Sequence, residues 1–362
     1  MVDSEHLRKI LNGALGFSAE KIEITRLAGD ASNRTYHRMT WNEPRSVRSL
    51  ILMVMSAPEG FKASEEAVSG APSPIAELPF INIQRHLRAC KVAVPEILFY
   101  DPARGWLLLE DLGDTTLADK IQEKANGNEA GLRNYYHKAI DTLLTIQMEA
   151  TAAPSDGCLA HHRAFDQALF LWEFDHFIEY GIEARNGTPI PPKQREAIRA
   201  HFSDISLRLA SLPQVFTHRD YHSRNLMIQS EPAGAAIRVI DFQDALMGPP
   251  HYDLASLLRD SYIDLPEQVI DDLIGYYLTR REARSGERVQ AEMFREYFDL
   301  VSIQRNLKAA GRFVYIDQVK KNPRFLPYVP PTLRKVKRNL EKYRRLAPLQ
   351  SLLAEYVEEL QR

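Results

Sequence analysis

Two polar segments joined by a short hairpin place the strongest restriction on the fold of this 362-residue chain. The first segment is His218–Asn225, and the second is the stretch 239–244, which contains Asp241. The apolar stretches 225–228 and 237–242, separated by a turn with proline and glycine, predict two antiparallel strands. The hairpin returns Asp241, near the end of the second strand, to the loop that contains Asp220. The chain must therefore fold so that these distant polar residues meet.

These side chains have the chemistry that phosphoryl transfer needs, which is a carboxylate beside the acceptor hydroxyl and oxygen ligands for Mg²⁺. We expect Asp220 to act as catalytic base, Asn225 as a metal ligand through its amide oxygen, and Asp241 as a bridging metal carboxylate. The alternative is that these residues only form turns. The hairpin spacing favours the metal site, because a chance motif is rarely followed by a strand that ends in Ile-Asp-Phe.

Two further residues are expected to support this loop. His218 is interpreted as a structural residue that fixes the backbone through a hydrogen bond. Asp253 precedes an apolar helical pattern, so it can be an N-terminal cap or a buried carboxylate that braces the loop, and both roles can hold together.

The rest of the chain predicts an α+β fold with two lobes. Residues 1–112 are expected to form a small lobe, a mainly antiparallel sheet with one helix at 78–90. Residues 113–362 are expected to form a larger helical lobe, with 111–115 as the hinge and 56–76 as a loop that is either a lid or merely disordered. The expected strands of the sheet are 22–27, 35–41, 49–55, 97–100 and 106–110.

The charge balance gives no reason to expect a nucleic acid or a membrane surface as partner, because the formal net charge is -2. The segment 331–346 carries seven basic residues, but Leu333, Val336 and Leu340 share one helix face. This pattern favours a solvated helix packed on the core over a binding patch. The N-terminus has no long apolar stretch, so neither a signal peptide nor a membrane span is expected.

The cysteine and histidine pattern predicts no metal centre apart from the Mg²⁺ site. The two cysteines, Cys90 and Cys158, are not at a ligand-like spacing, which favours reduced thiols in the cytoplasm. His161 and His162 are adjacent, so their side chains point apart, and a third ligand is missing.

Several segments together resemble the aminoglycoside phosphotransferase/choline kinase superfamily, and within it the anomeric N-acetylmuramate/N-acetylglucosamine kinases of bacterial cell-wall recycling. The resemblance implies a protein-kinase-like fold, ATP and Mg²⁺ as cofactors, and a small-molecule sugar as the partner of a monomeric enzyme. The segments that carry it are 27–32, 107–114, 218–227, 240–245, 248–255 and 304–311.

The resemblance also implies where the nucleotide binds. Gly29, Ala31 and Ser32, in the turn before the second strand, would lie over the phosphates. The backbone from Glu110 to Leu112 would meet the adenine. The chain departs from kinase-like folds, because the third strand has no lysine and the helix 78–90 has no glutamate to pair with one.

A cation for the phosphates must then come from elsewhere. Arg34 or Arg38 is a candidate, with a solvated strand residue as the equal alternative for Arg38.

Sugar-binding residues are expected between the catalytic loop and the helices. Arg305 and Lys308 share one helix face and could meet an acidic substituent of the sugar, with an ordinary ion pair as the alternative. Trp172 could stack on a sugar ring, with core packing as the alternative. The alternatives for the whole chain are an aminoglycoside, choline or another small alcohol as acceptor, or a pseudokinase without turnover. The candidate acceptor residues are Glu173, Asp175, Tyr221, Arg259, Asp260, Arg305 and Lys308.

Overall fold

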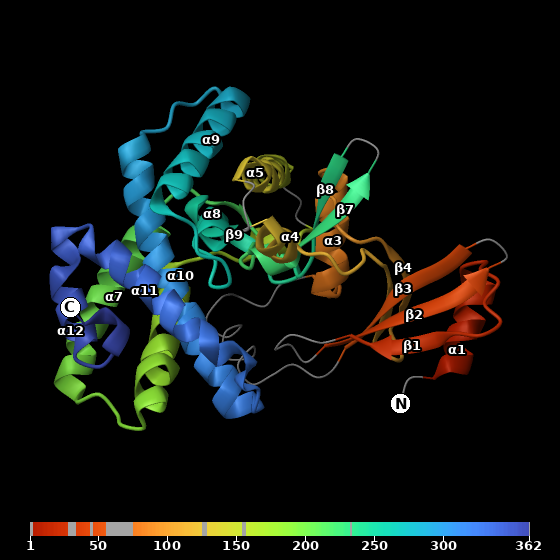
Figure 1. The fold of residues 1–362 in the computed structure, drawn as a ribbon, viewed down its shortest axis with the longest axis horizontal. Helices are drawn as coiled ribbons and strands as arrows, with labels where there is room; N and C mark the ends of the chain where they lie inside the picture. The colour runs from red at the N-terminus through yellow and green to blue at the C-terminus, as the bar shows by residue number, and fades with distance from the viewer. Residues whose placement is uncertain are drawn as a thin grey trace. The chain divides into compact units, whose positions relative to one another are not determined.

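The computed structural model describes residues 3–27, 34–43, 46–55, 75–124, 129–153, 157–231 and 234–361 (Figure 1). The chain divides into two compact units. The first unit comprises Met1–Ala63 and Val94–Asp114, and the second comprises Ser64–Ala93 and Thr115–Arg362. The candidate loop 56–76 lies largely outside the described residues.

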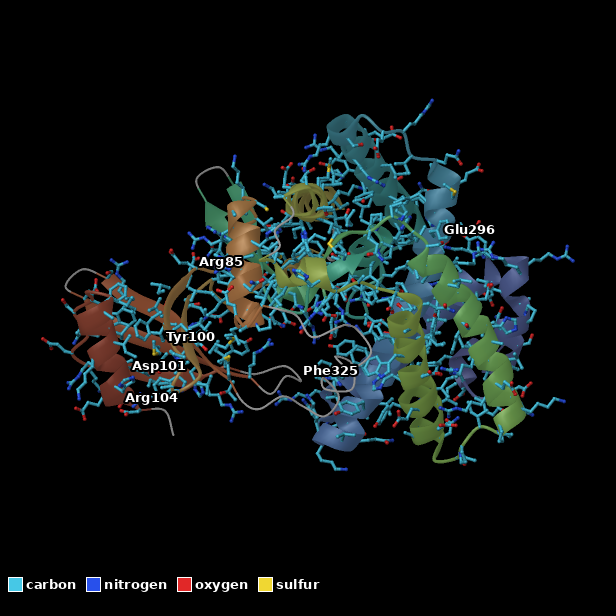
Figure 2. The ribbon with its side chains drawn as sticks, turned by 180° about the vertical axis from the view of Figure 1, so that it is seen from behind. Arg85, Tyr100, Asp101, Arg104, Glu296 and Phe325 are labelled. Carbon is cyan, nitrogen blue, oxygen red and sulfur yellow. The ribbon has the colours of Figure 1, made fainter. Side chains whose placement is uncertain are left out.

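The first unit is an antiparallel sheet with strand order β1-β2-β3-β5-β4. The short helix α1 (Ser4–Lys9) and the π-helical turn Ile10–Ala14 cover the sheet. Asp101 accepts backbone hydrogen bonds from Ala103 and Arg104 in the tight turn that joins the last two strands (Figure 2). The strands are β1 (Glu23–Arg26), β2 (Thr35–Glu43), β3 (Ser46–Val54), β4 (Ile97–Asp101) and β5 (Trp106–Glu110).

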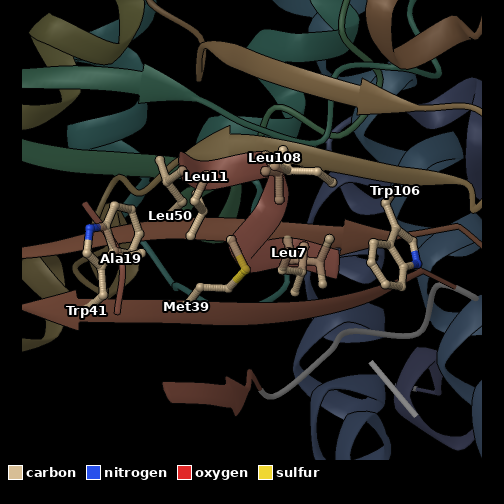
Figure 3. Packing of buried hydrophobic residues seen from close by; sticks show 10 residues of the cluster. Leu7, Leu11, Ala19, Met39, Trp41, Leu50, Trp106 and Leu108 are labelled. Atoms are coloured by element: carbon tan, nitrogen blue, oxygen red, sulfur yellow. The ribbon is translucent and has the colours of Figure 1, made fainter. Parts of the chain in front are cut away.

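The core of this unit lies between the N-terminal helix and one face of the sheet (Figure 3). Leu7 and Leu11 are four residues apart, so they lie on one side of the helical segment and both are fully buried. Met39 and Trp41 alternate along β2 and meet them from the sheet. The period of about four on the helix and two on the strand thus gives each element one apolar face.

The second unit is mainly helical, as the sequence predicts. Its long helix α10 (Ala291–Lys320) contacts α6, α8 and α11 and runs through the core of the unit (Figure 1). The other helices are α3 (Pro79–Ala89), α4 (Leu117–Lys124), α5 (Glu129–Ala152), α6 (Gln167–His176), α7 (Pro192–Ala210), α8 (His251–Leu258), α9 (Glu267–Ser285), α11 (Val329–Glu341) and α12 (Ala347–Ala354).

Two small antiparallel strand pairs interrupt these helices. The pair β7 (Leu226–Glu231) and β8 (Gly234–Val239) is the predicted hairpin, with Leu226 opposite Val239. The pair β6 (Val215–Thr217) and β9 (Leu246–Gly248) lies on either side of it in the sequence and is not evident from the pattern. The polar segment that contains Asp220 lies between β6 and β7, and the one that contains Asp241 lies between β8 and β9. The two strand pairs therefore fix both ends of each segment.

The helix expected to belong with the sheet belongs instead to the helical unit. Asn82 of α3 donates to the backbone oxygen of Gly157, and its side-chain oxygen accepts from the backbone N–H of Leu159. His86 of the same helix lies 2.9 Å from the backbone oxygen of Ala150. The structure thus divides the chain at 63/64, 93/94 and 114/115 rather than at 112.

The basic segment 331–346 packs as predicted, with Leu333, Val336 and Leu340 buried. Lys335 is an exception to its solvated face, because its ammonium group is buried and donates to the backbone oxygens of Asp260 and Ile263. Among the residues that the structure describes, no helix has both the length and the apolar character needed to span a membrane.

Candidate active site

The loop that contains Asp220 is fixed by hydrogen bonds to its backbone. The buried carboxylate of Asp253, on α8, accepts from the backbone N–H groups of His218 at 2.7 Å and Arg219 at 2.9 Å. The ring of His218 donates from Nε2 to the backbone oxygen of Ile240, 3.0 Å away. His218 thereby ties the loop that contains Asp220 to the segment before Asp241, and Asp253 holds the same loop through its backbone.

Burial raises the pKa of Asp253 to about 6, although the two backbone donors and His218 favour its charged form. Arg219 has a φ of 78°, which is in the left-handed region that a side chain disfavours. The bonds to Asp253 hold the backbone in this conformation, so the turn before Asp220 depends on this carboxylate.

The three residues predicted to bind Mg²⁺ or act beside it lie together. The amide nitrogen of Asn225 lies 3.0 Å from the backbone oxygen of Asp220 and 3.5 Å from a carboxylate oxygen of Asp241. A half-turn of this amide about its last torsion presents its oxygen on the same side. One amide oxygen and one carboxylate are the hard donors that Mg²⁺ prefers, so these residues fit that ion.

The hairpin and a neighbouring glutamine position Asp241. It follows β8 by two residues and has a φ of 63°. Gln243 donates to a carboxylate oxygen of Asp241 at 2.9 Å and to Asp244 at 3.0 Å. Gln243 is a site residue that the sequence pattern did not single out, and only its place two residues after Asp241 could have indicated it.

Positive charges surround the carboxylate of Asp220. Burial opposes ionisation of this group, but Lys308, His222 and Arg305, and then Arg219, hold its pKa well below the ordinary value. Asp220 is therefore a carboxylate at neutral pH, ready to accept a hydrogen bond from a hydroxyl group.

A buried ionic cluster lies beside Asp220. Glu173 of α6 is fully buried and pairs with Arg219 at 3.1 Å and Lys308 at 3.2 Å. Gln304 adds a hydrogen bond of 2.7 Å to the same carboxylate. Burial disfavours the charge on Glu173, but Lys308 and Arg219 keep its pKa below the ordinary value. Glu173 thus acts as the counter-ion of Arg219 and Lys308. Among the acceptor candidates, Lys308 and Arg305 are the two whose positive charge acts on Asp220.

Three other acceptor candidates make contacts within the fold. Tyr221 is fully buried, and its hydroxyl donates to the backbone oxygen of Ala139 at 2.8 Å. Arg259 is buried against Glu267. Asp260 is buried and accepts from the backbone N–H groups of Ser223 and Tyr262. These side chains hold the loop that contains Asp220 and the neighbouring helices in place.

The remaining candidates, Trp172 and Asp175, lie on α6, the helix that also carries Glu173. Asp175 forms an ion pair with Arg199 at 2.9 Å, and Trp172 is partly buried with its ring stacked on His176. The stacking of Trp172 matches its alternative of packing, and the ion pair engages Asp175 within the helical unit.

A stacked arginine next to Asn225 was not expected from the sequence. The guanidinium of Arg224 lies 3.6 Å from the ring centre of Tyr262 and 4.9 Å from that of Tyr328. It also donates to the hydroxyl of Tyr328 at 2.6 Å. These partners are 38 and 104 residues away in the sequence, respectively, so no local pattern could indicate the contact.

The nucleotide-side candidates belong to the first unit. Gly29, Ala31 and Ser32 lie outside the described residues, and Arg34 directly precedes β2.

Arg38 is an ion-pair residue rather than a solvated one. It donates to Asp111 from Nε at 2.7 Å and from Nη2 at 3.0 Å, and to Asp114 at 2.9 Å. A guanidinium already paired with two carboxylates is a poor replacement for the missing lysine.

The hinge candidates lie at the end of β5 and directly after it. Glu110 is the last residue of that strand, and its side chain accepts from the backbone N–H of Glu96 at 3.2 Å, while Leu112 is buried.

The chain is similar to known phosphotransferases in sequence and in fold. A model described as the phosphotransferase enzyme family matches residues 23–289. An N-acetylmuramate/N-acetylglucosamine kinase of Neisseria meningitidis serogroup B is 32% identical over 337 residues, which are 92% of this chain and 91% of that protein. A kinase of the same description from Pseudomonas putida is 34% identical over 280 residues, 76% of this chain and 77% of its own length.

A solved choline kinase from Cryptosporidium parvum Iowa II matches with a TM-score of 0.59 at 12% identity, over 97% of this chain and 100% of that one. At this identity the likeness concerns the fold alone, and it confirms the predicted kinase-like α+β architecture.

Proposed function

Because the chain belongs to the phosphotransferase enzyme family, we propose that it transfers the γ-phosphoryl group of ATP, with Mg²⁺, to the anomeric hydroxyl of N-acetylmuramate or N-acetylglucosamine. The observation that carries the proposal is the meeting of Asp220, Asn225 and Asp241 at one end of the hairpin. The names of the relatives, which cover 92% and 76% of the chain, support the choice of sugar.

Each of these residues has a distinct task in the proposed reaction. Asp220 accepts a hydrogen bond from the sugar hydroxyl, orients its oxygen toward the phosphorus, and takes the proton as the new O–P bond forms. Asn225 and Asp241 would hold Mg²⁺, which supplies charge compensation for the phosphate oxygens when bound. The products are ADP and the sugar phosphate.

The charges near Asp220 favour a neutral or acidic sugar over a polycationic aminoglycoside. Lys308, Arg305 and Arg219 all act on the Asp220 carboxylate, and the buried acid that contacts two of these cations, Glu173, is already paired with them. A polycation would meet repulsion there, whereas Lys308 or Arg305 could attract the carboxylate of an acidic sugar.

A panel of acceptors tests the proposal. Purified protein with Mg²⁺ and ATP is expected to release ADP with N-acetylmuramate and N-acetylglucosamine, and less or none with an aminoglycoside or choline. Phosphorus NMR of the product then identifies the phosphorylated oxygen. Turnover with choline or an aminoglycoside alone would overturn the choice of sugar.

The role of Asp220 has its own test. Asp220→Asn removes the base but keeps the size of the side chain, so kcat should fall by a factor on the order of 10²–10⁴ while ATP binding is retained. Asp204→Asn, an exposed aspartate of α7, is the matched control and should keep wild-type turnover. Wild-type kcat in the Asp220 variant would refute the assignment.

A pseudokinase remains the second candidate, because the third strand lacks a lysine and α3 lacks a glutamate. Absence of sugar-dependent ATP turnover under all conditions of the panel would favour it.

The use of ATP and the two free thiols, Cys90 and Cys158, also fit our proposal that the chain acts in the cytoplasm, as a monomer. Size-exclusion chromatography with light scattering tests the oligomeric state.

A further inference from the structure

A second group of metal-binding side chains lies outside the catalytic loop. His86 comes from α3, while Cys158 and His161 come from the turn after α5. Their ligand atoms all lie within 4.8 Å of one another. One thiol and two imidazoles are nitrogen and sulfur donors, so this group differs in kind from the oxygen donors at Asp241.

Hydrogen bonds hold the two segments together independently of any ion. Asn82, one turn before His86, donates to the backbone oxygen of Gly157 at 2.7 Å and accepts from the backbone N–H of Leu159 at 2.8 Å. These bonds flank Cys158 and fix it against α3. The backbone N–H of His161 bonds to the oxygen of Cys158 at 3.1 Å, which turns the chain so that both residues belong to one cluster.

The two histidines share one backbone acceptor. Nε2 of His86 lies 2.9 Å and Nε2 of His161 lies 3.1 Å from the backbone oxygen of Ala150. A carbonyl can only accept, so each Nε2 carries the hydrogen and each ring keeps Nδ1 as its electron-pair donor. A backbone carbonyl that orients a histidine in this way is the usual outer partner of a metal ligand.

We propose that His86, Cys158 and His161 form a zinc site, with a water molecule as the fourth ligand. Zinc takes thiolate and imidazole donors in a tetrahedral arrangement, whereas Mg²⁺ disfavours sulfur. Bonds of about 2.0–2.3 Å to zinc place two ligand atoms about 3.5 Å apart. Because the separations reach up to 4.8 Å, the side chains need to close by up to about 1.3 Å. Cys90 is turned toward the backbone oxygen of Glu149, so the fourth position belongs to water.

The position of the cluster gives the ion a structural task. The ring of Phe216 in β6 stacks on His86 with ring centres 5.5 Å apart, and β6 leads directly to His218. An ion at His86, Cys158 and His161 would therefore join α3 to the turn after α5, beside the strand that leads to the catalytic loop. Arg85, labelled on α3 in Figure 2, precedes His86 and is paired with Glu77.

The cluster differs from what the sequence predicts. His161 and His162 do point to different surroundings, but the missing ligands come from other positions, Cys158 being three residues before His161 and His86 75 residues before it. The spacing of the two cysteines alone could not reveal a site in which only one of them takes part.

Metal titration of the untagged full-length protein tests the proposal. The protein is stripped with a chelator, kept reduced, and titrated with Zn²⁺ in excess Mg²⁺, which occupies the catalytic oxygen donors. One equivalent should bind and raise the Tm. Substitution by Co²⁺ should give a thiolate-to-metal charge-transfer absorption, which the oxygen site cannot produce.

Three variants distinguish a zinc site from ordinary packing of the cluster's side chains. Cys158→Ser and His86→Gln should each weaken zinc binding by at least about tenfold, and Cys158→Ser should abolish the charge-transfer band. His162→Gln, at the exposed neighbour of His161, is the matched control and should bind as wild type.

No zinc-dependent rise in Tm and no charge-transfer band in the wild type would overturn the proposal, as would equal losses in the His162 control. Circular dichroism of the metal-free variants shows whether each is folded, and if Cys158→Ser is not, the zinc affinity of His86→Gln decides between the two outcomes. Because sugar kinase activity is not the readout, failure here leaves the proposed function untouched.

Discussion

At the scale of single residues, Glu173 influences the candidate active site without belonging to the predicted metal set. It is fully buried and neutralises Arg219 and Lys308, two of the cations that act on Asp220. A buried ion pair adds little net stability compared with apolar packing, but removal of one partner leaves an uncompensated charge. Glu173 therefore sets both the stability of this region and the charge that Asp220 experiences.

Glu173→Gln should lower the free energy of unfolding by about 3–5 kcal/mol, because Arg219 and Lys308 then lose their buried counter-ion. The released Lys308 should also pair more closely with Asp220, so kcat should fall. Urea unfolding and steady-state kinetics measure the two effects. Glu149→Gln, at an exposed glutamate of α5, serves as control. A loss of stability no larger than in this control would contradict the role of Glu173.

At the scale of elements, Glu267 joins four helices of the second unit. It lies in the first turn of α9 and pairs with Arg259 after α8, Arg295 of α10 at 3.0 Å, and Lys342 after α11 at 3.0 Å. Burial disfavours the charge on Glu267, but Arg259 and Lys342 lower its pKa from 4.5 to about 2. One carboxylate thus holds several helix ends in position.

The pH dependence of stability should report this carboxylate. Because its pKa is lower in the folded state, ionised Glu267 stabilises the fold fully above the unfolded value of 4.5 and loses this effect as pH falls toward 2. Glu267→Gln should therefore be less stable than wild type at pH 7, with a difference that shrinks below pH 4.5. Urea unfolding at several pH values measures it. A difference independent of pH, or one equal to that of Glu292→Gln on an exposed site, would be inconsistent with this role.

The elements also show what the sequence could predict. The hairpin β7–β8 and the meeting of Asp220, Asn225 and Asp241 follow from local spacing, because a short turn leaves few alternatives. The contacts of Tyr221 and Arg259 do not, because the direction of a side chain depends on helices far away in the sequence. The three-residue strands β6 and β9 are too short to give a periodic pattern.

At the scale of the whole molecule, the chain forms two units, and it passes between them after Asp114. Arg38 of β2 links the segment before this point to the sheet. It donates two hydrogen bonds to Asp111 and a third to Asp114. Asp111 keeps a lowered pKa despite its burial, because Arg38 bonds to it. The division of helix α3 from the sheet shows that sequence order alone does not define the units.

A double-mutant cycle measures the coupling energy between Arg38 and Asp111. Arg38→Gln and Asp111→Asn should each destabilise the first unit, with a coupling energy of about 1.5–3 kcal/mol because the pair is bidentate and charged. Mg²⁺-ATP affinity measured in the same proteins shows whether Arg38 also serves the nucleotide. Additive effects of the two substitutions would mean that the pair contributes nothing of its own.

The backbone at Asp241 has a consequence for how this chain can change over time. With a φ of 63°, Asp241 holds a conformation that glycine adopts without penalty, and an aspartate there costs on the order of 1 kcal/mol. A glycine at position 241 would relax the turn while it deletes the carboxylate. Conformational stability therefore favours glycine at this position, whereas the proposed reaction requires aspartate. If the reaction were no longer needed, a substitution that makes the protein more stable but inactive could become fixed there.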